Sequence, residues 1–175
     1  MFFYDLYLRI NITGHRSIDK KDFEEVSKHL EVEIERLISL GVTSFCAGGA
    51  LGFDTLSAGK IIDFKNRFPQ IKLVLVLPCK TQTNGWSEVN KNEYNFILER
   101  ADEVIYTSEK YYTGCMHTRN RKMVELSAYC IAYLHTNAGG TFYTVQYAKS
   151  EVLRLLMCRK ICRLSGYSVL QFSIF

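Results

Sequence analysis

Four segments of the chain place glycine, proline or polar side chains directly after an apolar run. They are Thr13-Gly14-His15-Arg16, Gly48-Gly49-Ala50-Leu51-Gly52-Phe53-Asp54, Pro78-Cys79-Lys80 and Asn137-Ala138-Gly139-Gly140-Thr141. Glycine lets the backbone approach a ligand closely, and the first N–H groups of a helix attract anions. One such segment would hold a phosphate weakly, because a charge at an exposed helix end gains only about 0.3–1 kcal/mol. Several of them, with Arg16 and either Arg119 or Arg121, predict a nucleotide site; the competing interpretation is that the glycines only shape tight turns.

Three side chains near these segments each allow two interpretations. Asp54 either caps the helix that follows it or accepts hydrogen bonds from ribose hydroxyls. His15 either contacts a phosphate, with a possible role as general acid, or serves as a positional hydrogen bonder. Trp86, in a polar stretch, either covers a nucleobase or seals its own loop.

A fifth segment, 111–121, is dense in hydrogen-bonding side chains and includes Arg119 and Asn120. Guanidinium groups at the start of a helix suit phosphate or carboxylate, whereas the alternative is a solvated basic face. The candidate ligand contacts are therefore Gly14, His15, Arg16, Gly48, Gly49, Ala50, Asp54, Pro78, Trp86, Arg119, Asn120, Gly139, Gly140 and Thr141.

Several standard sites have no support in the sequence. Neither glycine loop matches G-x-G-x-x-G or G-x-x-x-x-G-K-[ST], so a dinucleotide fingerprint and a Walker phosphate loop are not predicted. No histidine, cysteine or acid spacing predicts a metal, and no Ser-His-Asp or Cys-His set can be assembled. We expect no required cofactor beyond a nucleotide-derived ligand.

Strands and helices alternate along the chain, as judged from apolar periodicity and turn residues. Strands are predicted at 6–13, 42–47, 71–77, 103–107, 129–134 and 160–164. Helices are predicted from an N-cap at Ser17 or Asp19 to Gly41, and then at 51–64, 89–100, 116–128 and 141–157. The first helix carries its apolar stripe at Phe23, Val26, Leu30, Ile34, Leu37 and Ile38.

Helical connections of this length join parallel strands, so we predict an α/β, Rossmann-like three-layer sandwich with a mostly parallel sheet. The carboxyl ends of such strands share one edge, where open α/β sheets bind ligands. The four segments should therefore converge there. At 175 residues, without a repeat or linker, the chain predicts one domain over 1–175, with 165–175 unplaced.

Composition narrows the class of protein. Apolar residues make up 47% and charged residues 23%, which is typical of a globular chain. No apolar run approaches the roughly 20 residues of a membrane span, and residues 1–9 do not resemble a secretory signal, so we expect a cytoplasmic protein. Six cysteines without a C-x-x-C pair predict reduced core thiols. A net charge of +4 permits modest attraction to phosphates but falls short of a duplex binder.

In this order the segments resemble the YpsA-like family of the SLOG superfamily, a Rossmann-like group that includes the DNA-processing protein DprA and the LOG phosphoribohydrolases. The similarity extends over about residues 6 to 164. It includes the run Tyr-x-x-Gly-Cys-Met at 111–116 and Arg119-Asn120-Arg121-Lys122-Met123 as well as the glycine segments. The resemblance implies a nucleotide or nucleotide-derivative ligand, and we expect a homo-oligomer.

The LOG enzymes carry M-H-x-R-K-x-x-M followed by P-G-G-x-G-T-x-x-E and cleave a base from a nucleoside monophosphate. Met116, His117, Arg119 and Met123 match the first pattern, but the acidic position of the second falls on Thr144. A threonine cannot stabilise an oxocarbenium-like centre as a carboxylate does. This argues against the hydrolase unless Asp54 or Glu125 supplies the carboxylate.

Three functions follow from these observations. The leading hypothesis is a sensor or regulator that binds a nucleotide-derived ligand, such as an ADP-ribose-like molecule or a dinucleotide. The second is an N-glycosidase or phosphoribohydrolase that uses Arg119 with Asp54 or Glu125. The third is single-stranded nucleic-acid binding in the manner of DprA, favoured by the basic balance and 11 tyrosines but weakened by the lack of a concentrated Lys/Arg stripe in the sequence.

Overall fold

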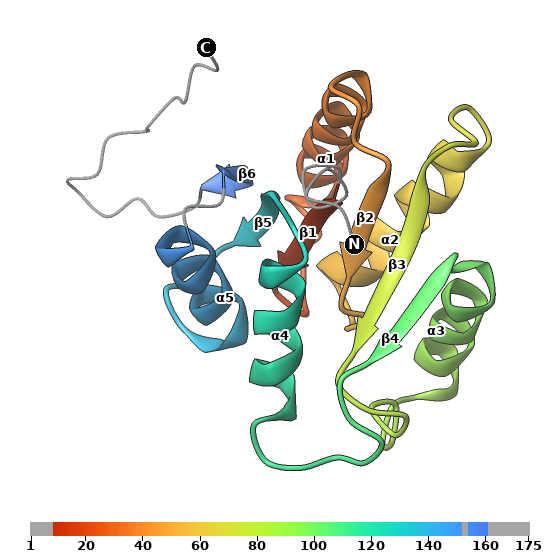
Figure 1. Cartoon of the computed structure of the whole chain (residues 1–175), viewed down its shortest axis with the longest axis vertical. Coiled ribbons are helices and arrows are strands. Elements are labelled where there is room, and N and C mark those ends of the chain that lie inside the picture. The colour runs from red at the N-terminus through yellow and green to blue at the C-terminus, as the bar shows by residue number, and fades with distance from the viewer. Residues whose placement is uncertain (1–8, 152–153, 161–175) are drawn as a thin grey trace.

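The computed structural model describes residues 9–151 and 154–160. The strands are β1 (Arg9–Gly14), β2 (Ser44–Ala47), β3 (Lys72–Leu77), β4 (Glu103–Tyr106), β5 (Tyr129–Leu134) and β6 (Arg154–Lys160). The helices are α1 (Phe23–Ser39), α2 (Phe53–Lys65), α3 (Glu88–Arg100), α4 (Cys115–Glu125) and α5 (Gly139–Ser150). They alternate along the chain as the periodicity predicts (Figure 1).

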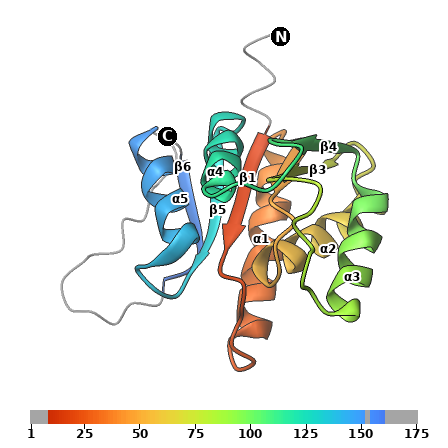
Figure 2. The same ribbon diagram turned by 90° about the horizontal axis from the view of Figure 1, so that it is seen from below.

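The described strands form one sheet in the order β4-β3-β2-β1-β5-β6, and every neighbouring pair is parallel. The first four strands extend the sheet in one direction, and the chain then returns to add β5 on the other side of β1. Because the direction reverses at β1, the crevice between the carboxyl ends of β1 and β5 is the topological switch point. Seen from below, α4 and α5 lie on one face of the sheet and α1, α2 and α3 on the other (Figure 2). The predicted three-layer architecture is confirmed.

The alternation of side chains along each strand builds two separate cores. Ile10, Phe45 and Leu73 face α1 and α2 in the larger one, which is fully buried at these residues. Their sequence neighbours Cys46 and Val74 point to the opposite face, where they pack with residues of α4. Since burial of an aliphatic side chain contributes about 1.5–3 kcal/mol, both helix layers are held firmly against the sheet.

The first helix begins later than predicted. Asp19 opens a turn in which its carbonyl accepts a hydrogen bond from Asp22 N at 2.9 Å, and α1 starts at Phe23. The apolar stripe is buried as predicted from Val26 to Ile38, but Phe23 itself remains 47% exposed. The N-cap signal at Ser17 and Asp19 thus marks the turn before the helix.

The prediction of a helix over 141–157 was wrong in its second part. The predicted helix over 141–157 stops at Ser150, and Arg154–Lys160 form a strand beside β5. The apolar residues at 152–157 fit a helical stripe and a buried strand equally well, and the free side of β5 favours the strand. Of the strand predicted at 160–164 only Lys160 is described, as the last residue of β6. Residues 161–164, like 6–8 and 165–175, lie outside the described residues.

Candidate functional site

The loops after β1 and β5 and the start of α2 are hydrogen-bonded to one another at the switch point. His15 N donates to Tyr133 O at 3.3 Å, and Thr136 N donates to His15 Nε2 at 3.4 Å. Phe53 N, the first N–H of α2, donates to His15 O at 3.1 Å. One residue after β1 therefore fixes two other segments at the carboxyl edge.

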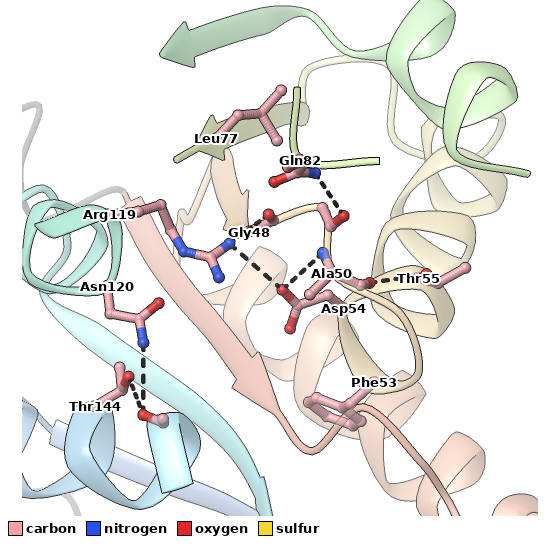
Figure 3. A network of polar contacts seen from close by, with 12 residues as sticks. Gly48, Ala50, Phe53, Asp54, Thr55, Leu77, Gln82, Arg119, Asn120 and Thr144 are labelled. Atoms are coloured by element: carbon pink, nitrogen blue, oxygen red, sulfur yellow. Dashed lines mark hydrogen bonds and ion pairs between the residues drawn. The ribbon is translucent and has the colours of Figure 1, made fainter. Parts of the chain in front are cut away.

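The amino-terminal half of α4 joins the remaining loops to this edge. Arg119 donates from one guanidinium nitrogen to the carbonyl of Gly48, and Asn120 Nδ2 donates to the carbonyl of Gly140 at 3.5 Å (Figure 3). The glycine segments after β2 and β5 thus lie on the same edge of the sheet, as the parallel topology predicts.

Arg119 and Asp54 form a buried ion pair across the end of β2. Their side chains are 8% and 6% exposed, and Arg119 Nη1 lies 3.9 Å from Asp54 Oδ2, which also accepts a hydrogen bond from Ala50 N at 3.3 Å. Burial raises the pKa of Asp54, although Arg119 and the backbone N–H groups oppose this rise. Burial likewise lowers the pKa of Arg119 against the opposing effect of Asp54. The pair therefore holds the loop at 48–50, and a direct contact of either side chain with a ligand stays a prediction.

The guanidinium of Arg119 is not fully satisfied by these partners. Among the described residues its Nε is buried and has no hydrogen-bond acceptor. A buried donor without an acceptor costs roughly 1–3 kcal/mol. The site therefore retains unused hydrogen-bonding capacity at its most buried cation.

Packing explains two of the glycines. A Cβ at Gly48 would overlap the Arg119 guanidinium and lie 2.7 Å from Asp54 Oδ2, and a Cβ at Gly14 would collide with the Phe53 side chain. At these two positions the missing side chain leaves room for Arg119 and Phe53. The turn at Gly139 differs, because its φ is 81° and a Cβ there would meet no heavy atom within 4 Å. The turn before α5 therefore has free space beside its backbone at Gly139, unlike the positions of Gly14 and Gly48.

Two basic residues follow β1 at the same edge of the sheet. Arg16 is exposed, and its charge acts on both Asp54 and Arg119. The His15 ring is half-buried, 4.0 Å between centroids from the ring of His135, and burial followed by the nearby His135 lowers the pKa of His15. Its hydrogen bonds support the positional interpretation of His15.

Sequence reasoning missed two residues of the site. His135 directly follows β5, and Gln82 Nε2 donates to the carbonyl of Gly49 at 2.9 Å. The position of His135 directly after a predicted strand was the available signal for it. No signal in the sequence singled out Gln82, which lies 33 residues from Gly49.

Three other predicted ligand contacts, Pro78, Trp86 and Thr141, are at least partly buried. Pro78 is buried, and its carbonyl accepts a hydrogen bond from Thr107 Oγ1 at 3.3 Å. Trp86 is half-buried and rests edge-on against Tyr94 with a centroid distance of 5.7 Å, which favours the loop-sealing interpretation. Thr141 is buried at the start of α5. These side chains support the loops at the edge.

The three positions considered for a catalytic carboxylate lie in different surroundings. Asp54 is buried against Arg119, and Thr144 donates its hydroxyl proton to the carbonyl of Gly140 at 2.8 Å. Glu125 is exposed at the last position of α4, about 9 Å along the helix axis from Arg119 at 1.5 Å per residue. None of these residues presents a carboxylate beside the open turn.

Within residues 9–151 and 154–160, no group of three or more His, Cys, Asp and Glu side chains is arranged to hold a metal ion. The cysteines at 46, 79, 115 and 130 are free and buried, which confirms the core-thiol prediction for these four positions. No described helix combines the length and apolarity of a membrane span.

A known protein family matches most of the chain. The model of the YspA SLOG family, YpsA, matches residues 10–155. The chain belongs to the YpsA family of SLOG proteins. This confirms the resemblance seen in the sequence. A UPF0398 protein of Halalkalibacterium halodurans is 29% identical to this YpsA-family chain over 152 residues, which are 81% of this chain and 80% of that protein. A UPF0398 protein of Bacillus thuringiensis is 26% identical over 152 residues and is covered to 83%.

Solved structures share the fold of this YpsA-family chain at lower identity. DNA processing protein A (DprA) from Streptococcus pneumoniae superposes with a TM-score of 0.62 at 16% identity, over 86% of this chain and 50% of that one. DprA from Helicobacter pylori, described for its single-stranded DNA binding mode, gives 0.62 at 20% identity, over 87% and 66%. The chain thus spans half of the first DprA and just under two thirds of the second. These likenesses confirm the Rossmann-like fold.

Proposed function

We propose that this YpsA-family protein binds a nucleotide-derived small ligand at the carboxyl edge of its sheet and acts as a sensor or regulator. The observation that carries the proposal is the convergence at the switch point, where Arg119 and Asn120 hold the loops after β2 and β5. Membership of the SLOG family supports a nucleotide-related ligand. We expect this ligand to be an ADP-ribose-like molecule or a dinucleotide.

The structure favours a division of roles within the site. The open turn at Gly139 and Gly140, with the start of α5, supplies backbone for a phosphate, and the exposed Arg16 supplies charge. Arg119 and Asp54 act as positioning residues that set the loop at 48–50. His15 fixes the loop after β5 through Thr136 N.

Isothermal titration of the full chain with AMP, ATP, NAD and ADP-ribose tests the proposal. We expect at least one of them to bind, and Arg16→Gln to weaken that binding about tenfold or more, as the loss of a charge-assisted hydrogen bond does. Arg67→Gln is the matched control, because Arg67 is also an exposed arginine but belongs to the α1–α3 layer, where it pairs with Glu35 at 2.7 Å. An absence of heat with every nucleotide at millimolar concentration, from folded protein, would refute the proposal.

The same incubations address catalysis and assembly. Chromatography of the mixtures for free base tests the phosphoribohydrolase alternative, and we expect the nucleotides to remain intact because no carboxylate among the three considered faces the open turn. Light scattering with and without ligand tests the expected homo-oligomer. A ligand-dependent change of mass would support the regulatory role.

A further inference from the structure

The outer side of the α4–α5 layer carries a connected group of aromatic and basic side chains. Arg121 Nε donates to the hydroxyl of Tyr143, and its guanidinium carbon lies 5.7 Å from the ring centroids of both Tyr143 and Tyr147. The two tyrosine rings are nearly parallel, at 6° and a centroid distance of 6.4 Å. His117 packs edge-on against Tyr143 at 4.6 Å. With Lys122, the exposed neighbour of Arg121 in α4, these residues are called the α4–α5 surface.

This surface is separate from the carboxyl-edge site although it uses the same helix. Arg119 and Arg121 lie two positions apart in α4, so their side chains leave the helix about 200° apart at 3.6 residues per turn. Arg119 is buried toward the loop at 48–50, whereas Arg121 is exposed. A molecule on the α4–α5 surface would therefore not occupy the crevice at the switch point.

The charge of this part of the chain is mainly basic. Residues 110–151 contain five lysines and arginines and two acids, Glu125 and Glu151, and α5 contains no acid. Glu125 acts electrostatically on Arg121. Among the described residues, however, no carboxylate forms an ion pair within 4.0 Å of Arg121 or Lys122. The cations of the α4–α5 surface thus remain available to an external anion.

Similar arginine–aromatic contacts elsewhere are neutralised. Arg67 lies 5.6 and 5.2 Å from the rings of Phe64 and Phe68 but pairs with Glu35. Arg100 lies 3.6 Å from the ring of Phe96, with a Glu99 oxygen at 3.7 Å. The combination of stacked rings and unpaired cations distinguishes the α4–α5 surface from these two contacts.

We propose that the α4–α5 surface binds single-stranded nucleic acid, by stacking bases on Tyr143 and Tyr147 and by pairing phosphates with Arg121 and Lys122. Aromatic rings flanked by basic side chains are the usual means of holding an unpaired strand, because every base offers a flat face regardless of sequence. A duplex hides those faces, and an acidic polypeptide would use the cations but not the parallel rings. The chemistry therefore favours an unpaired polynucleotide.

Fluorescence anisotropy with a labelled oligothymidine of about 16 nucleotides, a length that covers a typical single-strand site, tests the proposal on the full chain. Two phosphate contacts predict a slope of about −1.4 in log K against log salt concentration, and Arg121→Gln should reduce the slope by about 0.7. Tyr147→Leu should weaken binding about fivefold or more, whereas Tyr147→Phe should keep it, since the ring is retained. Arg67→Gln, the neutralised arginine–aromatic contact, should leave binding unchanged.

Four results would overturn the proposal. Two of them are an absence of anisotropy change at low salt and equal binding by wild type, Arg121→Gln and Tyr147→Leu. The other two are a loss of affinity in Arg67→Gln as large as that in Arg121→Gln, and displacement of the oligonucleotide by polyglutamate as readily as by unlabelled oligothymidine. The last result would assign the surface to an acidic polypeptide. Circular dichroism of each variant checks that the fold is retained. Nucleotide titrations of Arg121→Gln should match wild type, so failure here is distinguishable from failure of the carboxyl-edge site.

Discussion

Arg119 and Asn120 follow one another in α4, yet their side chains hold two different loops, Arg119 at Gly48 and Asn120 at Gly140. Successive side chains leave a helix about 100° apart, so one points toward the end of β2 and the other toward α5. The loops after β2 and β5, on either side of β1 in the sheet, are therefore attached to a single rigid element (Figure 3). A displacement of α4 would move both loops together.

The buried ion pair gives the first prediction. Arg119→Met would leave Asp54 buried without its guanidinium, and removal of one partner of a buried pair costs about 3–5 kcal/mol. Asp54→Asn combined with Arg119→Met should cost clearly less than the two single changes added together, because no lone charge then remains buried. Urea unfolding followed by circular dichroism measures all three variants. Additive losses would show that the two side chains do not interact.

Two glycines in neighbouring segments should respond in opposite directions to alanine. Gly48→Ala would drive a Cβ into the Arg119 guanidinium and should lower the free energy of unfolding and detach the loop at 48–50. Gly59→Ala lies inside α2 with no heavy atom within 4 Å of the added Cβ, and should raise the free energy by about 0.5–1 kcal/mol. Thermal unfolding of both variants tests the pair. A tolerated alanine at residue 48 would contradict the packing described for Arg119.

The half-buried His15 predicts a pH dependence of stability. Burial lowers the pKa of His15 below 6.5, so between the folded pKa and 6.5 the unfolded chain binds more protons than the folded one. The His15 contribution to stability should therefore be fully present above pH 6.5 and should be lost as the pH falls through that window. Protonation would also abolish the acceptor that His15 Nε2 offers to Thr136 N. The free energy of unfolding, measured from pH 7.5 to 5, should depend less on pH in His15→Gln than in the wild type. His29→Gln, at an exposed histidine, is the control. Identical pH profiles of wild type and His15→Gln would show that His15 is not the cause.

Two core thiols should resist alkylation. Burial raises the pKa of both Cys46 and Cys130 to about 12. Because the thiolate is the nucleophile, iodoacetamide at neutral pH should leave these two residues unmodified in the folded protein. Peptide mapping by mass spectrometry, with a urea-denatured sample as the reference, measures the modification. Rapid labelling of Cys130 without denaturant would show that the packing of β5 against α4 and α5 opens readily.

Local patterns in the sequence were sufficient to predict the sheet and most of its helices. The apolar run of β3 is short and is followed by Pro78, which favours a strand, and the stripe of α1 has the helical period; both elements appear in the structure. The segment after Ser150 fits two periodicities, and only the free side of β5 decides between them. A local pattern contains no information about that neighbour.

The location of the site was predictable, whereas its internal contacts were not. Parallel strands bring their carboxyl ends together in any order, so the loops at 14–16, 48–50 and 137–140 had to meet. The pairing of Arg119 with Asp54 joins residues 65 positions apart and depends on how α4 packs over β2. The contact of Arg121 with Tyr143 depends in the same way on the packing of α4 against α5. Neither contact leaves a signal in the sequence.

The position of β1 inside the sheet has a consequence for biosynthesis. As the chain leaves the ribosome, β1 can pair with β2 early, but its other neighbour, β5, begins only at Tyr129. Until then β1 is an unprotected edge strand that invites pairing with other chains. The nascent protein also lacks the β5 side of the switch point during that interval, so the arrangement of loops at the carboxyl edge can form only after the second half of the sheet is complete.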